Sequence, residues 1–589
     1  MTAIIVLSPA ASALARRLKQ ARPQWRVHGL ATRVDGADIG FDDAVSHLRA
    51  VFARGEAIVG LCASGILIRA LGPVLADKMS EPPVLTVTPD GSAAVPLLGG
   101  HHGANDLARE VAEILGGIAA VTTAGDGVLG VSLDEPPKGW KIADPSTIKP
   151  VAAALLAGRS ASISGDAPWL STLPQGADGE TVTVTHLASP AQGLVYHPPR
   201  LVVGVGCERG VPAEDVTACV SDVLAQAGLS PKAVAMVASI DLKADEAGIH
   251  VVADALGVPA RFFTPERLEA ERPRLQTPSD VVFAETGCHG VAEGAALAAV
   301  GPDGDLIVPK VKFQRVTVAV ALSPSDIDPD SVGQSRGRLF VMGIGPGAPR
   351  WRSPEVEGAI GQVTDLVGYG LYLDLLGPLA AGKNRHQSDL GKEIDRARMA
   401  LDLAAQGKSV ALVCSGDAGI YALATLVFEL MDHEDRPDWR RLDLSVLPGI
   451  SALQAAAARA GAPVNHDFCT ISLSDLLTPW PTIERRLEAA ARGDFVVCFY
   501  NPVSQRRRDQ LTRARDILLS GRGPDTPVVL ARNLGRDGET VEIIRLADLG
   551  PDRADMLTMI VVGNSETRRL GVGDRTYVYT PRGYGKILT

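Results

Sequence analysis

Short runs of β-branched and other apolar residues alternate along this chain with stretches rich in Ala and Leu. Such apolar runs occur, for example, at residues 4–7, 201–205, 339–343, 409–414 and 559–562. Each run has the length of one buried strand, and the stretches between runs have the length of helices that connect strand to strand. The pattern predicts a multidomain α/β protein with largely parallel sheets, whose active sites lie at the carboxyl ends of the strands.

Stretches rich in Pro, Gly, Ser and Asp interrupt this alternation and indicate domain boundaries. They occur at residues 134–145, 189–200 and 323–337, and the last has no apolar periodicity, which is typical of a linker. A chain of 589 residues has room for about four domains. We therefore expect a first domain at residues 1–133, a middle region at 134–199, a third domain at 200–322, a linker at 323–337 and a final domain at 338–589.

Composition excludes several classes of function. The chain has 58 basic and 68 acidic residues, a net charge of −10, and only 4% aromatic residues. A negative field repels nucleic acids, and the few aromatic side chains disfavour a platform for stacked bases. No apolar stretch reaches the roughly 20 residues that cross a bilayer, and the first apolar run has no signal-peptide flank. We expect a cytoplasmic protein that binds neither nucleic acid nor membrane.

The seven cysteines are scattered singly, without a C-x-x-C pair. Neither a disulfide framework nor a zinc or iron–sulfur site is indicated, so we expect no bound metal. This use of cysteine is typical of a reducing compartment.

Five turns rich in Gly, Pro or Asn follow strand-like runs of the final domain. They are, in order, residues 343–347 (GIGPG), 414–419 (CSGDAG), 447–452 (LPGISA), 498–502 (CFYNP) and 532–536 (RNLGR). Glycine in such a turn lets backbone amides approach a ligand, because no Cβ intervenes. Any one turn could be only a tight connection or a helix cap. The first also resembles a dinucleotide fingerprint, which leaves an NAD-dependent dehydrogenase as an alternative, although Pro346 interrupts the helix that a pyrophosphate needs.

The ordered series of turns resembles the tetrapyrrole (class III) S-adenosylmethionine-dependent methyltransferases over residues 338–589. The similarity is closest to the precorrin-3B C17-methyltransferases, and it rests on residues 367–374 (VGYGLYLD), 393–397 (EIDRA), 415–421 (SGDAGIY), 500–508 (YNPVSQRRR) and 562–565 (VGNS). The resemblance implies two α/β subdomains with S-adenosylmethionine in the cleft between them, and a homodimer. It further implies methylation of precorrin-3B, or of its cobalt form, at C17 with contraction of the ring to precorrin-4 in cobalamin biosynthesis.

The resemblance assigns roles to particular residues of the final domain. Asp417 and His386 are the candidates for accepting a proton during ring contraction, although Asp417 could equally cap a helix. Arg485, Arg506 and Arg507 could hold the carboxylate arms of the substrate, or could form a solvated helix face. The residues expected to contact the methyl donor are Gly345, Pro346, Gly347, Ser415, Gly416, Asp417, Ile420, Ile450, Ser451, Ala452, Tyr500, Asn501, Asn533, Thr558 and Met559.

Residues 1–322 resemble the CbiG family of cobalt-precorrin-5A hydrolases, and the third domain also resembles CobE. The similarity rests on residues 62–66 (CASGI), 97–108 (LLGGHHGANDLA), 204–210 (GVGCERG), 238–246 (ASIDLKADE) and 311–319 (VKFQRVTVA). It implies opening of a lactone with release of acetaldehyde, for which His101 or His102 could activate water. The Gly-rich loop around these histidines could instead only shape a wall, and residues 207–209 could bind a propionate arm. Two hypotheses follow: a bifunctional enzyme, or a methyltransferase with a non-catalytic scaffold half that binds tetrapyrroles.

Overall fold

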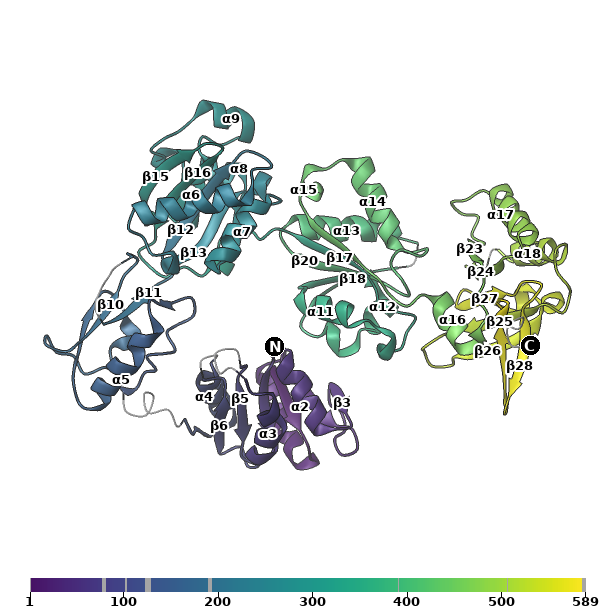
Figure 1. Ribbon diagram of the computed structural model, residues 1–589, viewed down its shortest axis with the longest axis horizontal. Helices are drawn as coiled ribbons and strands as arrows, with labels where there is room; N and C mark the ends of the chain where they lie inside the picture. Colours follow the sequence, from purple (N-terminus) through teal and green to yellow (C-terminus); the bar gives the residue numbers. More distant parts are fainter. Residues whose placement is uncertain are drawn as a thin grey trace. The chain divides into compact units, whose positions relative to one another are not determined.

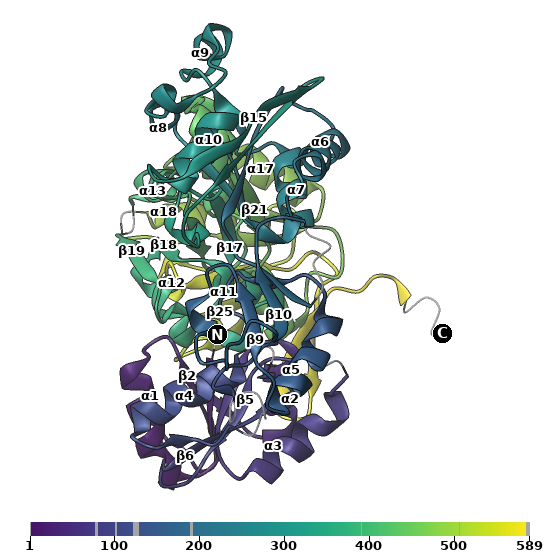
Figure 2. The same ribbon diagram turned by 90° about the vertical axis from the view of Figure 1, so that its left-hand side faces the viewer.

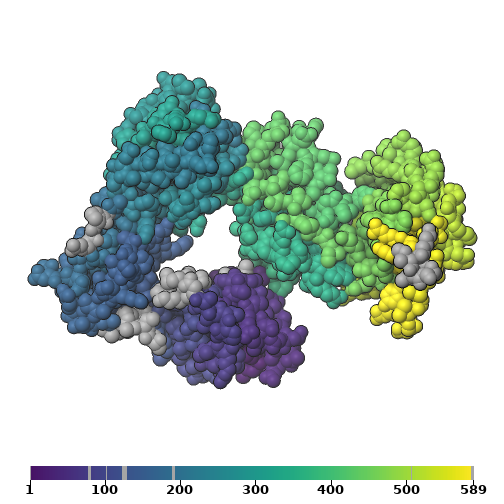
Figure 3. Space-filling model, in the orientation of Figure 1, coloured from purple at the N-terminus to yellow at the C-terminus, as the bar shows by residue number. Residues whose placement is uncertain are grey.

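The computed structural model describes residues 2–76, 81–100, 103–121, 129–188, 193–389, 391–505 and 507–584 (Figure 1). The chain forms two compact units, Met1–Arg336 and Gly337–Thr589. Figure 3 colours the first unit from purple to teal and the second from green to yellow.

The first domain is built on a sheet with the strand order β3-β2-β1-β4-β5-β6-β7. The strands are β1 (Thr2–Val6), β2 (Arg26–Leu30), β3 (Ile39–Phe41), β4 (Ala57–Leu61), β5 (Val84–Val87), β6 (Ala93–Leu98) and β7 (Ile118–Ala119). The helices are α1 (Ser12–Ala21), α2 (Ala44–Ala53), α3 (Ser64–Leu71) and α4 (Ala104–Leu115). Side chains alternate between the two faces of a strand, so Ile4 and Val6 pack with α1 and α4, whereas Ala3 and Ile5 pack with α2 and α3.

The middle region is a smaller sheet with the strand order β8-β11-β10-β9. Its elements are β8 (Lys141–Ile142), α5 (Ile148–Leu156), β9 (Ala161–Ser164), β10 (Glu180–Val184) and β11 (Leu194–His197). Several hydrogen bonds tie it to the third domain and to the stretch that follows that domain. Trp140 Nε1 donates to Asp326 at 2.6 Å, and Lys232 Nζ donates to the carbonyl of Ala143 at 2.6 Å.

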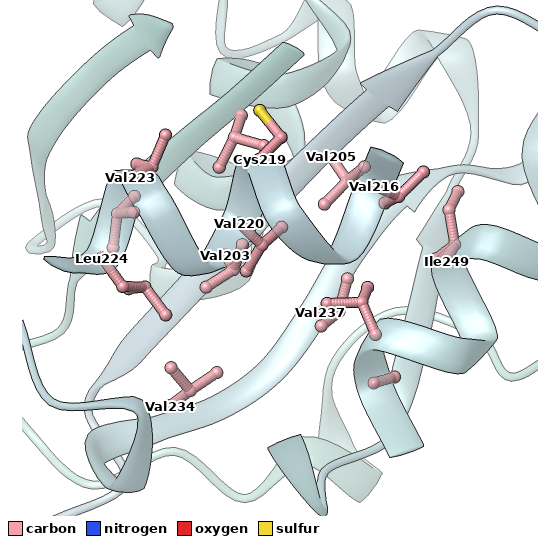
Figure 4. Close-up of a cluster of buried hydrophobic side chains, with 14 of the residues drawn as sticks. Val203, Val205, Val216, Cys219, Val220, Val223, Leu224, Val234, Val237 and Ile249 are labelled. Atoms are coloured by element: carbon pink, nitrogen blue, oxygen red, sulfur yellow. The ribbon is translucent and has the colours of Figure 1, made fainter. Parts of the chain in front are cut away.

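The third domain has a sheet with the strand order β14-β13-β12-β16-β15. The strands are β12 (Leu201–Cys207), β13 (Val234–Ile240), β14 (Ala260–Phe263), β15 (Asp305–Phe313) and β16 (Val316–Leu322). The helices are α6 (Ala213–Gln226), α7 (Ala247–Leu256), α8 (Pro265–Glu269), α9 (Asp280–Thr286) and α10 (Val291–Val300). Val203 and Val237 of the sheet pack against Val220 of α6 and Ile249 of α7 (Figure 4). The apolar helix α10 covers the other face of the sheet.

The expectation of parallel strands does not hold at one side of this sheet. β15 pairs antiparallel with β16, and β16 pairs antiparallel with β12. Only Gln314 and Arg315 connect β15 to β16, and Gln314 has a φ of 49°. So short a connection forms a hairpin, because parallel strands need a crossover of about a dozen residues or more. β15 is therefore the outer strand of the sheet (Figure 2).

The stretch 323–337, which the sequence predicts to be a linker, packs against the third domain over residues 323–335. The N–H of Ser323 donates to the carbonyl of Arg200 at 2.9 Å, and Gln334 pairs with Phe262 beside the outer strand β14. These contacts cover a sheet edge that would otherwise expose unpaired backbone groups.

The first subdomain of the second unit is a fully parallel sheet with the strand order β19-β18-β20-β17-β21. The strands are β17 (Arg338–Gly343), β18 (Asp365–Tyr369), β19 (Asn384–Ser388), β20 (Ser409–Cys414) and β21 (Asp443–Leu447). The helices are α11 (Pro354–Gln362), α12 (Gly370–Asp374), α13 (Glu393–Ala405), α14 (Leu423–Glu434) and α15 (Pro437–Arg440). α13 and α14 cover one face and α11 and α12 the other (Figure 1). The carboxyl ends of β17, β20 and β21 therefore lie at one edge of the sheet.

The second subdomain has a mixed sheet with the strand order β23-β24-β27-β25-β26. Its strands are β23 (Phe468–Ser472), β24 (Val496–Tyr500), β25 (Pro527–Arg532), β26 (Thr540–Arg545) and β27 (Thr558–Val562), and a small sheet contains β22 (Gly461–Ala462), β28 (Arg568–Val572) and β29 (Arg575–Tyr579). α17 (Trp480–Arg492) and α18 (Asp509–Leu519) cover one face of the mixed sheet, and α16 (Ala452–Ala460) covers the other. β25 and β26 are antiparallel because residues 533–539 are too few for a crossover helix.

Candidate active site

The turns after β17, β20 and β21 pack backbone against backbone. Gly345 and Gly416 exchange two hydrogen bonds between their N–H and C=O groups, at 3.1 and 2.9 Å. A Cβ on Gly343 would lie 2.4 Å from the carbonyl oxygen of Gly416, and a Cβ on Gly449 would lie 2.2 Å from the same atom. Only glycine fits at these two positions, so the sequence pattern of the turns is a consequence of their close approach.

Asp417 joins two of these turns. Its Oδ1 accepts a hydrogen bond from the N–H of Gly419 at 2.8 Å, and its Oδ2 accepts one from the N–H of Gly449 at 3.0 Å. Just beyond, Ser451 starts α16 with a capping box: its hydroxyl accepts from the N–H of Gln454, and the Gln454 side chain accepts from the N–H of Ser451. These bonds fix the shape of the cavity wall that the turns after β20 and β21 form.

Loops of the second subdomain form the facing wall. They are the end of β24, the turn after β25 and the start of β27, and they bring Asn501 and Asn533 to the site. Tyr421, Asn501 and Asn533 have φ values of 50°, 49° and 58°, and they are three of the six described non-glycine residues with positive φ. Strained backbone of this kind gathers at binding sites, where the surrounding structure holds it in place.

A cavity of about 210 Å³ lies between the two walls. Its lining residues are Pro346, Tyr372, Ser415, Gly416, Asp417, Ile420, Tyr421, Ser451, Ala452, Tyr500, Asn501, Asn533, Leu534, Arg536, Met556, Leu557, Thr558 and Met559. Most residues expected to contact the methyl donor are in this set. Gly345, Gly347 and Ile450 are not in this set. Gly345 packs against the backbone of Trp351 and Gly347 against that of Gly535, whereas Ile450 is 39% exposed.

The sequence did not single out Tyr372, Tyr421, Leu534, Arg536, Met556 or Leu557 as site residues, although they line the cavity. Tyr372 and Tyr421 belong to segments that carry the family resemblance, and Arg536 belongs to the fifth turn, so a signal was present for these three. Met556 and Leu557 precede β27 without a glycine or proline beside them, and no local pattern distinguishes them.

His386 lies on the edge strand β19, away from the cavity. Its Nε2 is 2.8 Å from Oδ1 of Asp365, whose side chain is only 1% exposed. Asp365 is the first residue of β18, at the end of the sheet opposite to the turns. The hydrogen bond to a buried carboxylate accounts for His386 without a catalytic role.

The predicted substrate arginines have different environments. Arg485 is an exposed residue of α17 whose Nη2 is 3.4 Å from the hydroxyl of Thr482 in the same helix. Arg507 is buried and donates to the carbonyl of Asn501 at 2.6 Å, so it supports a turn of the cavity wall, and burial lowers its pKa. Arg506, His101 and His102 lie outside the described residues.

In the third domain, charged side chains of the motifs that resemble CbiG form ion pairs with one another. Arg315 pairs with Glu208 at 2.7 Å, and Arg209 pairs with Asp245 at 2.8 Å. Burial raises the pKa of the Cys207 thiol to about 11, so the thiol stays protonated at neutral pH. Because Arg209 and Arg315 already have carboxylate partners, this arrangement gives no direct support to a propionate site.

The residues of the cavity fit S-adenosylmethionine, the cofactor that the family implies. A Cβ on Gly416 would meet no protein atom closer than 3.9 Å, so this backbone leaves room for a ligand. The hydroxyl of Tyr500 is buried near Ser451 and has no hydrogen bond of good geometry among the described residues. The lining combines the polar amides of Asn501 and Asn533 with the apolar side chain of Met559. A nucleoside with an amino-acid arm requires such a mixture of polar and apolar contacts.

In the described ranges, no helix has both the length and the apolar character needed to cross a membrane. Nor do three or more His, Cys, Asp or Glu side chains come together there in a way that could hold a metal ion.

Three families match parts of the chain. Residues 338–550 match the Tetrapyrrole (Corrin/Porphyrin) Methylases, residues 46–126 match Cobalamin synthesis G N-terminal, and residues 201–321 match Cobalamin synthesis G C-terminus. A solved structure, "Crystal structure of the methyltransferase CobJ", is 43% identical in sequence and covers 42% of this chain and 100% of that chain, with a TM-score of 0.39.

Two curated relatives extend these matches. The "Cobalamin biosynthesis protein CobIJ" of Mycobacterium bovis is 40% identical over 316 residues, which are 50% of this chain; the chain thus spans 60% of that relative's length. The "Precorrin-3B C(17)-methyltransferase" of Sinorhizobium sp is 42% identical over 249 residues, which cover 42% of this chain and 97% of that protein. On this evidence the chain belongs to the tetrapyrrole (corrin/porphyrin) methylase family.

Proposed function

We propose that the unit Gly337–Thr589 transfers a methyl group from S-adenosylmethionine to C17 of precorrin-3B, or of its cobalt form, and contracts the ring to precorrin-4. The observation that carries this proposal is the cavity at the carboxyl ends of β17, β20 and β21. It lies within the segment that is 42% identical to a precorrin-3B C17-methyltransferase over almost all of that protein. The same likeness supports a place in cobalamin biosynthesis.

The chain's part in this reaction is mainly to position the reactants. S-adenosylmethionine, when bound, supplies an electrophilic methyl group, and the substrate carbon is electron-rich. Alignment of two such groups in a cleft can contribute several kcal/mol to catalysis. The glycine turns, fixed by Asp417 and Ser451, provide a rigid wall for that alignment.

Asp417 is the proposed proton acceptor for ring contraction. It is the one carboxylate among the described residues that line the cavity. An ionised carboxylate has about four acceptor positions, so two remain after the bonds to Gly419 and Gly449. Tyr372 cannot take this role at neutral pH, because burial raises its pKa and keeps the phenol protonated.

Incubation of the full chain with S-adenosylmethionine and, in parallel, cobalt-free and cobalt-bearing precorrin-3B tests the proposal. Mass spectrometry should show the gain of one methyl group in at least one of the two reactions, and fragmentation should place it at C17. Methylation at another carbon, or of neither substrate, would show that the proposal is wrong.

For the unit Met1–Arg336 we propose opening of the lactone of cobalt-precorrin-5A with release of acetaldehyde. Support comes from the two Cobalamin synthesis G matches, at residues 46–126 and 201–321. The candidate bases His101 and His102 lie outside the described residues. Feeding the lactone substrate to the full chain and assaying acetaldehyde tests this activity. If no aldehyde forms, this half is better explained as a tetrapyrrole-binding scaffold.

We also propose that the protein works as a cytoplasmic homodimer that associates through the methyltransferase unit. The resemblance to the methyltransferase family supports the dimer, and the scattered unpaired cysteines support a reducing compartment. Light scattering on the purified chain should give the mass of two chains, and a monomer at micromolar concentration would contradict the proposal.

A further inference from the structure

Arg536 is a cation in the cavity wall whose described partners are all neutral. Its Nε donates to the carbonyl of Pro346 at 2.8 Å, and its Nη2 donates to the hydroxyl of Ser415 at 3.0 Å. Nearby arginines of the same subdomain have carboxylate partners: Arg532 pairs with Asp555 at 2.8 Å, and Arg459 pairs with Glu539 at 2.5 Å. Arg536 has no ion pair with any residue that the structure describes.

The guanidinium of Arg536 has N–H donors left over for a ligand. It has five N–H donors in a planar fork, and the bonds to Pro346 and Ser415 leave Nη1 and one N–H of Nη2 without a partner in the described part of the chain. Even partial burial without a counter-charge is unfavourable for a cation, and the partial burial of Arg536 lowers its pKa accordingly. An anion in the cavity would complete both the hydrogen bonding and the charge balance.

We infer that Arg536 receives a carboxylate of a ligand bound in the cavity. The planar fork of arginine matches the two oxygens of a carboxylate, and hydrogen bonds between charged groups are stronger than neutral ones. The cavity wall offers no competing cation among its described residues, because Arg536 is the one Lys or Arg that lines it.

This inference rests on the proposed function, which offers two sources of the carboxylate. One is the amino-acid end of the methyl donor, and the other is an acetate or propionate arm of the tetrapyrrole. In either case the anion would also strengthen the link between the subdomains, because Arg536 follows β25 whereas its partners Pro346 and Ser415 follow β17 and β20.

The test is R536M in the full chain, with two ligands compared by calorimetry. S-adenosylhomocysteine carries the carboxylate, and 5′-methylthioadenosine has the same nucleoside and sulfur without it. If the donor supplies the carboxylate, R536M should weaken S-adenosylhomocysteine binding by about 10- to 100-fold and leave 5′-methylthioadenosine binding unchanged. If a substrate arm supplies it, both affinities should stay the same, and KM for the tetrapyrrole should rise by about 10-fold or more.

Two further variants separate charge from packing. R536K keeps the charge without the fork and should recover part of the lost affinity or KM. R545M is the matched control, because Arg545 is exposed, pairs with Asp548 at 2.8 Å and does not line the cavity. It should change none of these values.

Two results would overturn the inference. In the first, folded R536M loses affinity for both nucleosides equally, so that Arg536 serves only to hold Pro346 and Ser415. In the second, R536M matches the unaltered protein in both affinities and in KM. Methylation of precorrin-3B by the unaltered chain is measured separately, so failure of the proposed function is distinguishable from failure at Arg536.

Discussion

At Asp417, each carboxylate oxygen accepts a backbone hydrogen bond from a different glycine, Gly419 or Gly449. From the sequence alone, D417N should bind the donor normally, because Asn has the size of Asp. The geometry changes that expectation. The amide of Asn has only one acceptor oxygen. In D417N the NH₂ group would take the place of the second carboxylate oxygen, and it would face the N–H of Gly419 or Gly449.

We therefore expect D417N to weaken S-adenosylhomocysteine binding by about 10-fold, the usual effect of losing one hydrogen bond to a charged group. If Asp417 also accepts the proton, turnover with saturating donor should fall by about 100-fold or more. Calorimetry and single-turnover kinetics measure the two effects separately. Normal affinity would contradict the argument from geometry, and normal turnover at saturation would leave Asp417 as a support for the two turns only.

Gly416 has a φ of +70° and faces the cavity. G416V would place a branched residue in a left-handed conformation, at a cost of about 1–2 kcal/mol, and would direct its methyl groups toward the donor. We expect donor binding to be lost, as measured by calorimetry. The control is G358A in α11, where a Cβ meets nothing within 4 Å. It should raise the free energy of unfolding by about 0.5–1 kcal/mol and leave affinity unchanged. Normal affinity of G416V would show that this turn does not contact the donor.

At the scale of elements, the turns were predictable because each is a local signal, a Gly, Pro or Asn cluster after an apolar run. Arg536 belongs to one of these turns, but no local pattern indicates where its side chain reaches. It reaches Pro346, 190 residues away, only because the two sheets place their turns face to face. The antiparallel pairs β15–β16 and β25–β26 were missed although their connections are short. The apolar runs indicate strands without giving their direction, and only the length of the connection does so.

The surroundings of His386 could not be read from the sequence for a related reason, because its partner lies on another strand. Asp365 begins β18 and is bonded to His386 across the strand pair. Burial acts to raise the pKa of Asp365, but hydrogen bonds from His386 and Thr364 and the charge of Lys408 together bring it below its usual value. A carboxyl group with a depressed pKa contributes stability above its unfolded pKa of about 3.9, and this contribution is lost as the pH falls through the folded value.

D365N should therefore lower the free energy of unfolding at pH 7, by about 1–3 kcal/mol. The difference from the unaltered protein should shrink when urea unfolding is repeated well below pH 4, where the carboxylate is protonated. H386A should also be less stable at pH 7 but should bind S-adenosylhomocysteine normally, since His386 is outside the cavity wall. An equal loss of stability at both pH values would contradict the linkage argument, and loss of donor affinity in H386A would contradict its placement.

At the scale of the whole molecule, the site of the second unit is self-contained. Every residue that lines the cavity belongs to Gly337–Thr589. The same unit contains its own hydrophobic clusters on both faces of both main sheets. The Cobalamin synthesis G matches fall entirely within Met1–Arg336. Donor binding should accordingly need only the second unit.

The position of a cut between the units follows from the contacts of two residues, Ser335 and Gly337. The hydroxyl of Ser335 accepts a hydrogen bond from Arg261 of the first unit. The carbonyl of Gly337 instead accepts from the N–H of Asp443 at 2.9 Å, and a Cβ on Gly337 would lie 1.8 Å from the carbonyl oxygen of Ala404. A fragment that starts at Arg336 thus keeps every described backbone contact of β17 and loses only contacts of the first unit.

We expect the fragment 336–589 to fold and to bind S-adenosylhomocysteine with the affinity of the full chain, because no cavity residue is removed. Circular dichroism checks folding and calorimetry checks binding, and the complementary fragment 1–335 is the control that should not bind. A start at residue 344, which deletes β17, should abolish folding, since β17 lies between β20 and β21 in the sheet. If fragment 336–589 folds but fails to bind, and fragment 1–335 binds instead, the donor site lies in the first unit. That result would refute the assignment of the methyltransferase reaction to Gly337–Thr589.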